Sequence, residues 1–330
     1  MSEDSQQLSA NSAPQDTQWQ RDTIEKLATS ALSEQKKSRR WSMFFKGLMF
    51  LYLFIVLFYA IGWLGGSKKV SGAHTALIEV AGVIEAGGAV NADSFMTSLH
   101  DAYDDKNTKG IILRINSPGG SPVQAGIIND EIGRQKKLHP TIPVYAVVED
   151  ICASGGYYIA AAADKIYVDK ASIIGSIGVL MDGYGFTEVM KKVGVERRLM
   201  TAGENKGMLD PFSPINPKQQ ALAQTMLNEI HEQFKEVVRQ GRGSRLKETP
   251  EVFSGLFWSG EQGIKLGLAD ALGSADYVAR EVIKQETIVD FTYQDDFASR
   301  IAKRIGASTS AALGETLAKQ LVSAGEVKLR

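Results

Sequence analysis

The middle of the chain alternates between short apolar runs and stretches of helical spacing. The apolar or β-branched runs predict strands, and the stretches with apolar residues three and four apart predict helices. A strand, then a helix, then a strand implies parallel pairing with helical crossovers. The pattern therefore predicts an α/β fold, with strands at 75–83, 110–115, 141–148, 165–168 and 195–200, and helices at 92–105, 123–137, 186–193, 219–242 and 275–285.

One stretch near the N-terminus is apolar on every face. Residues 47–64 carry no charge, and 18 helical residues nearly cross a bilayer core. Trp41 and Trp63 lie near its two ends, where interfacial indoles belong. A buried globular helix is rarely so uniformly apolar, and a cleaved signal peptide fits poorly because the charged region begins late and no small-x-small cleavage site follows. We therefore expect a single transmembrane helix.

Basic residues are concentrated before this stretch. Only Lys68 and Lys69 follow it closely, whereas five lysines and arginines precede it, so the positive-inside bias predicts a cytoplasmic N-terminus and an exported C-terminal part. The expected domain organisation is a mostly disordered cytoplasmic tail at 1–46, a transmembrane helix at 47–64, a folded domain at 75–285 and a C-terminal tail at 286–330.

Composition excludes several classes of function. The net charge of −1 over 330 residues gives no general attraction to nucleic acid. The sequence has no phosphate-loop pattern and no His or Cys cluster at metal-ligand spacing, so we expect no nucleic-acid partner, no cofactor and no metal. Cys152 is the only cysteine, which excludes an internal disulfide. It is either a thiolate nucleophile or, as we prefer because no recognisable His partner motif accompanies it, a buried structural thiol.

Ser154 follows a predicted strand and precedes a helix of small residues. At such a turn the exposed N–H groups of the helix favour a developing alkoxide or oxyanion. Gly155 and Gly156 would let an extended peptide approach closely. The alternative is that Ser154 only caps a buried helix.

Two further segments carry candidate chemistry. The paired glycines Gly119 and Gly120 follow a strand and could offer backbone N–H groups to an oxyanion, although an ordinary Pro-Gly turn fits them equally. None of the four histidines lies in a loop that resembles a catalytic platform, and His231 is expected to be a solvated helix residue. A lysine can replace histidine as base when it is neutral, and Lys206 has the best loop setting.

The part from about residue 75 to 285 resembles the signal peptide peptidase A family of membrane-anchored serine proteases, which share the Clp protease/crotonase fold. The resemblance depends on several motifs in the same order. These are Asn116-Ser-Pro-Gly-Gly120, Ala153-Ser-Gly-Gly-Tyr-Tyr158, Gly175-Ser-Ile-Gly-Val179, the Gly203-x-x-Lys206 loop and Gly267-Leu-Ala-Asp-x-Leu-Gly273.

The resemblance implies a Ser/Lys dyad, with Ser154 as nucleophile and Lys206 as general base. It also implies an oxyanion hole from backbone N–H groups near Gly119 or Gly120, together with that of Ser154, and a Ser176 hydroxyl that orients Lys206. The family includes chains with two tandem domains and chains with one. This chain has one, so we expect a homo-oligomer with shared active sites.

The expected function is an endopeptidase of the bacterial inner membrane, with its catalytic domain in the periplasm, that degrades signal peptides. Two alternatives stay open: a crotonase-like acyl-CoA enzyme, which an exported location disfavours, and an inactive membrane scaffold of the same fold.

Overall fold

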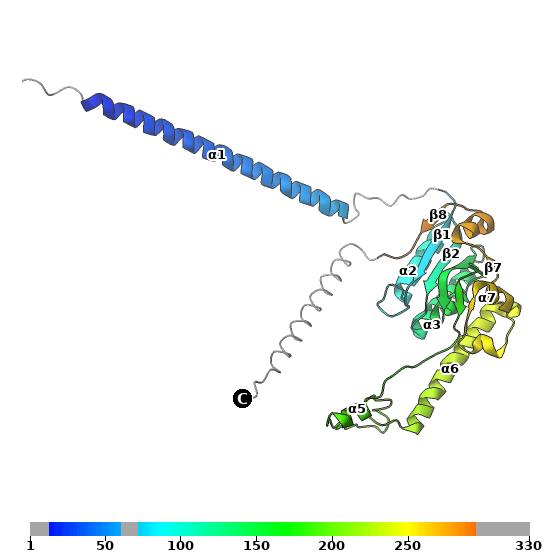
Figure 1. Ribbon diagram of the computed structural model, residues 1–330. Helices are drawn as coiled ribbons and strands as arrows, with labels where there is room; N and C mark the ends of the chain where they lie inside the picture. The colour runs from blue at the N-terminus through cyan, green and yellow to red at the C-terminus, as the bar shows by residue number, and fades with distance from the viewer. Residues whose placement is uncertain (1–12, 61–71, 295–330) are drawn as a thin grey trace, which may run out of the picture. The chain divides into compact units, whose positions relative to one another are not determined.

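The computed structural model describes residues 13–60 and 72–294, which fall in two separate units of the chain (Figure 1). The first unit contains helix α1 (Ala13–Ala60). Within α1, the segment 34–58 contains an 18-residue window with a mean hydropathy of 1.9, and no residue of that window is buried, so this segment is long and apolar enough to cross a membrane. A membrane anchor and a signal sequence both fit these properties. The last four residues of the predicted span, including Trp63, lie outside the described residues.

The structure differs from the prediction of a mostly disordered tail, because residues 13–46 are helical. This segment is rich in good helix formers such as Ala, Gln, Glu and Lys. It also runs directly into the apolar helix, so adding turns to an existing helix avoids the cost of nucleation.

The second unit is built on one sheet, as the alternating pattern predicted. Its main path has the order β6-β5-β3-β2-β1-β8, and β4 pairs with both β3 and β7. All pairs are parallel except β5 with β6. The strands are β1 (His74–Ala81), β2 (Thr108–Ser117), β3 (Val144–Ala153), β4 (Lys165–Val168), β5 (Ile173–Gly175), β6 (Phe257–Ser259), β7 (Ala271–Leu272) and β8 (Ile288–Asp290).

Helices cover both faces of this sheet. The α-helices are α2 (Ala92–Asp104), α3 (Pro122–Leu138), α4 (Gly155–Ala160), α5 (Thr187–Lys192), α6 (Pro217–Arg242), α7 (Gly260–Leu266) and α8 (Ala275–Tyr277), and short turns lie at Gly243–Arg245, Pro250–Phe253 and Val278–Ile283. The larger core contains apolar side chains of α2, α3, α4 and α6, and the smaller one lies under Val278 and Ala279 on the other face. Burial of apolar surface on both faces holds the layers together.

Two predicted elements need correction. The strand expected at 195–200 does not form, because this exposed segment lies near α5, at the far end of α6 from the sheet, where no strand is available for pairing (Figure 1). The folded domain also extends beyond residue 285, because β8 pairs with β1. Residues 295–330, most of the predicted C-terminal tail, lie outside the described residues.

Candidate active site

Ser154 occupies a strained turn between β3 and α4. Its backbone has φ 52° and ψ −122°, a conformation that costs a non-glycine residue about 1–3 kcal/mol and is concentrated at functional sites. The side chain makes no capping hydrogen bond, although Ser154 stands at the N-cap position of α4. The cap interpretation is therefore wrong, and the hydroxyl of this half-buried serine is left unengaged by the helix.

The paired glycines at the end of β2 pack directly against Ser154. Gly119 has φ 102°, and a Cβ added there would lie 2.7 Å from the Ser154 Cβ. Gly120 has φ 149°, and its Cβ would lie 2.1 Å from the carbonyl oxygen of Ile84. Both positions therefore require glycine for backbone conformation and for space.

Hydrogen bonds decide which N–H groups near Ser154 are free. The Gly119 N–H donates to Ser117 Oγ at 3.1 Å, and the Ser154 N–H donates to the Gly175 carbonyl at 2.9 Å. Gly120 and Gly155 have no acceptor for their N–H groups among the described residues, and Gly155 begins α4, where a helix leaves its N–H groups unpaired. The geometry therefore favours Gly120 and Gly155 as oxyanion donors over Gly119 and Ser154.

A pocket of about 630 Å³ opens beside these groups. Gly120, Ser154, Gly155 and Ser176 all line it, so the structure brings together three of the five predicted site residues, with Gly119 packed just behind. Ser176 also has a positive φ, 50°. The rest of the wall is mostly apolar and includes Tyr158, Val179, Leu180, Met181, Met226, Leu227, Ile230 and Phe234.

Lys206 lies away from this pocket. Its loop contacts the first turn of α6. The Lys218 Nζ lies 3.4 Å from the Glu204 carboxylate, and the Gln219 Nε2 lies 3.5 Å from Asn205 Oδ1. The pocket first reaches α6 at Met226, seven residues on from Gln219, or about 10 Å along the helix axis. Within the described residues no hydrogen bond joins Lys206 to Ser154 or Ser176. Lys206 is not among the residues that line the Ser154 pocket, and the dyad and the roles of Lys206 and Ser176 stay predictions.

The histidines and the cysteine offer no alternative catalytic group. Across residues 72–294, no hydrogen bond links a histidine to Ser154. Burial raises the pKa of Cys152, which keeps it a thiol, so the structural interpretation of this cysteine is confirmed. The prediction for His231 is wrong: its Nε2 lies 3.1 Å from the carbonyl oxygen of Ile177. Among the described residues there is no group of three or more His, Cys, Asp or Glu side chains that could hold a metal.

Comparison with known proteins covers the part of the chain that contains this site. The model of peptidase family S49 matches residues 136–289, which contain Ser154, Ser176 and Lys206. A protein of Synechocystis, named as a candidate protease (slr0021), is 31% identical over 201 residues, which are 61% of this chain and 70% of that protein. The chain belongs to peptidase family S49. This is a family of serine proteases, so the predicted resemblance is confirmed.

Other relatives match over a smaller share of their length. A protein of Brucella abortus named Na(+)/H(+) antiporter NhaA is 45% identical over 175 residues, 53% of this chain and 24% of that protein. A candidate signal peptide peptidase SppA of Enterococcus faecium is 31% identical over 209 residues, 62% of this chain and 60% of that protein. The chain thus spans from about a quarter to 60% of the length of these two relatives.

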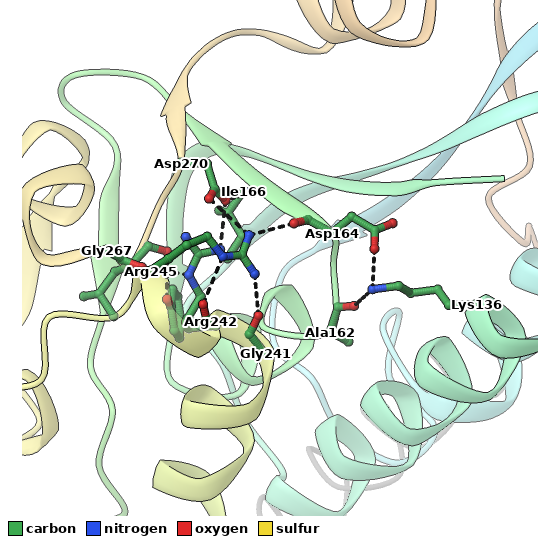
Figure 2. Close-up of polar contacts among 11 residues, drawn as sticks. Lys136, Ala162, Asp164, Ile166, Gly241, Arg242, Arg245, Gly267 and Asp270 are labelled. Carbon is green, nitrogen blue, oxygen red and sulfur yellow. Dashed lines mark hydrogen bonds and ion pairs between the residues drawn. The ribbon is translucent and has the colours of Figure 1, made fainter. Parts of the chain in front are cut away.

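The S49 motif at 267–273 has a structural role that its sequence did not disclose. The side chain of Arg242, at the end of α6, is fully buried and donates to the Gly267 carbonyl at 2.7 Å and to Asp270 at 2.8 Å. Asp270 also accepts from the Ile166 N–H and from Arg245, at 2.7 and 3.1 Å (Figure 2). This cluster fixes the C-terminal end of α6, a wall of the pocket, to the sheet.

We predict that Asp270→Ala destabilises the fold by about 3–5 kcal/mol, because it leaves the buried Arg242 guanidinium without its counter-charge. Glu248→Ala is the matched control: it breaks the exposed Arg239 pair, so it should cost no more than about 1 kcal/mol. Denaturant unfolding of the full chain in detergent measures both. Equal losses would show that the Arg242 pair is not critical.

The same carboxylate predicts acid sensitivity. Burial tends to raise the pKa of Asp270, but hydrogen bonds from Arg242 and the Ile166 N–H outweigh burial and lower it. A lowered pKa in the folded state means that this stabilisation is present above the ordinary pKa of about 3.9 and is lost as the pH falls through the folded-state value. The difference in stability between wild type and Asp270→Ala should therefore shrink below about pH 4.

Proposed function

We propose that this protein is a serine endopeptidase with Ser154 as its nucleophile. The observation that carries the proposal is the setting of Ser154: a strained turn, a hydroxyl outside any helix cap, and two unpaired N–H groups beside an apolar pocket. Donors fixed in place before reaction are what a developing oxyanion requires. Membership of a serine protease family supports the same chemistry.

The reaction is acyl transfer. Ser154 Oγ attacks the peptide carbonyl as Lys206 accepts its proton, and the oxyanion is bound by the N–H groups of Gly120 and Gly155. Lys206 then returns a proton to the leaving amine, and water hydrolyses the acyl-enzyme by the same route. Lys206 can accept a proton only when its amine is neutral.

The position of Lys206 supports a site shared between copies of the chain. Within one chain its loop lies along α6 from the pocket, so a neighbouring copy is proposed to supply the lysine. The segment between residues 180 and 215, which carries Lys206, has an uncovered apolar surface. Helix α5 has no buried residue, and Leu180 is 83% exposed, Met200 94% and Ile215 78%. A homo-oligomer would cover this surface.

The proposed location is the bacterial inner membrane, with α1 as anchor, the N-terminus in the cytoplasm and the catalytic domain outside it. The basic residues before the apolar segment support this orientation. A reporter that is active only outside the cytoplasm, fused after residue 330, should therefore be active. A silent reporter in a well-expressed fusion would reverse the orientation.

Signal peptides left in the membrane are the proposed substrates. Their apolar cores match the apolar wall of the pocket, and a relative is named a candidate signal peptide peptidase. The test is cleavage of a synthetic signal peptide by the full chain in detergent, with Ser154→Ala as control. Cleavage of the peptide by both proteins alike would overturn the assignment of Ser154.

A further inference from the structure

The pocket beside Ser154 has two facing walls from distant parts of the chain. One is the segment 175–181, which follows β5 and supplies Ser176, Gly178 and Val179. The other is α6, which supplies residues on both sides of position 231, among them Ile230 and Phe234. The distance between these walls determines which peptide fits beside the nucleophile.

The segment 175–181 is tightly curled, and its start is fixed to the sheet, where Gly175 also pairs with Ala153 of β3. The Ser176 N–H donates to the Leu256 carbonyl at 2.8 Å, and Gly175 pairs with Phe257 of β6. Ser176 keeps a positive φ, which a non-glycine residue holds only where its surroundings enforce it. On the side facing α6, one side chain holds the segment by a hydrogen bond.

That side chain is His231. Its Nε2 lies 3.1 Å from the carbonyl oxygen of Ile177, and this is the one hydrogen bond between α6 and residues 176–181 in the described part of the chain. A carbonyl oxygen only accepts, so Nε2 carries the hydrogen and donates. The side chain of Ile177 is completely buried, whereas its carbonyl oxygen is the acceptor for His231. His231 itself does not line the pocket.

We propose that His231 is a positioning residue that sets the width of the peptide-binding pocket by tying segment 175–181 to α6. The proposal rests on the proposed peptidase function, because it assigns the pocket to peptide binding. His231 acts through the main chain of Ile177 and does not contact the reacting atoms. Its loss should weaken peptide binding and leave the reactivity of Ser154 unchanged.

Three variants of His231 separate the donor from the ring. His231→Gln places an amide N–H near the position of Nε2. The side chain of His231→Asn is shorter, so its amide does not reach the Ile177 carbonyl. His231→Phe keeps an aromatic ring but has no donor. A hydrogen bond is worth about 0.5–1.5 kcal/mol, so His231→Asn and His231→Phe should raise KM for an apolar peptide roughly two- to tenfold, with His231→Gln within about twofold of wild type. His100→Asn is the matched control, because His100 bonds Glu131 on α3, outside the pocket.

Two further measurements make the test specific. The rate at which a small fluorophosphonate labels Ser154 should stay within about twofold of wild type in all variants, since that probe does not span the pocket. Hydrogen exchange of peptides that cover residues 175–181 should be faster in His231→Asn and His231→Phe and unchanged in His231→Gln and His100→Asn, because only the first two lose the restraint.

Several outcomes would overturn the proposal. It fails if KM for the apolar peptide is the same in all three His231 variants. It also fails if the rate of Ser154 labelling by the fluorophosphonate falls together with peptide cleavage. Hydrogen exchange requires no turnover, so it separates this inference from the proposed function. If wild type cleaves no peptide, the peptidase assignment fails, and unchanged exchange in His231→Phe independently removes the role of His231.

Discussion

Lys206→Ala should lower the rate of peptide cleavage roughly 10²- to 10⁴-fold, the usual contribution of a general base. The chain has no histidine bonded to Ser154 in its described part, so little other base chemistry is available to the serine. Lys206→Arg should fail equally, because a guanidinium stays protonated at any usable pH and cannot accept the serine proton.

The matched control for this loss is Lys192→Ala. Lys192 is an exposed lysine of α5 in the same extended segment, and it should be dispensable. Initial rates on one peptide across a pH series, with assembly checked by light scattering, measure all four proteins. Normal turnover by Lys206→Arg would assign the base to another residue.

Co-expression of Ser154→Ala and Lys206→Ala chains should restore about a quarter of wild-type activity. The expectation follows from the proposal that a neighbouring copy supplies the lysine, because Lys206 does not line the Ser154 pocket of its own chain. Cyclic assemblies use head-to-tail interfaces, so the Ser154 of one copy could face the Lys206 of the next at every junction. With random mixing of equal amounts, about one junction in four then joins an intact serine to an intact lysine.

A site built within one chain predicts no recovery, because every copy lacks one of its two groups. Differential affinity tags on the two chains allow mixed assemblies to be isolated and their composition to be measured. Mixed assemblies that stay as inactive as either parent would rule out the shared site. Activity near the wild-type level would also contradict it, since three junctions in four are defective.

The sequence predicted the parts of the fold that depend on long periodic segments. Strand β4 was expected at its observed bounds, and α2, α3 and α6 lie within two residues of theirs. The strands of two or three residues, β5 to β8, were missed, because alternation cannot be recognised over so few positions. The exposed strand expected at 195–200 was wrong, since a strand needs a partner that its own sequence does not specify.

In the candidate site too, local features were predicted and contacts between distant residues were not. Ser154 and the paired glycines were predicted because a strand-to-helix turn and adjacent glycines are local features. The choice of Gly120 and Gly155 as free donors was not. It depends on a local hydrogen bond from the Gly119 N–H to Ser117 and on Gly175, which tertiary folding brings to the Ser154 N–H. His231 was missed for the same reason: its partner is 54 residues away in the chain.

Labelling by a serine-directed fluorophosphonate, located by peptide mass mapping, tests the central assignment most directly. The full chain in detergent should gain one probe per chain, on Ser154, and Ser154→Ala should gain none. Prior denaturation should abolish labelling, because the reactivity depends on the strained turn and the two N–H donors. Labelling of a different serine, or equal labelling of Ser154→Ala, would contradict the account.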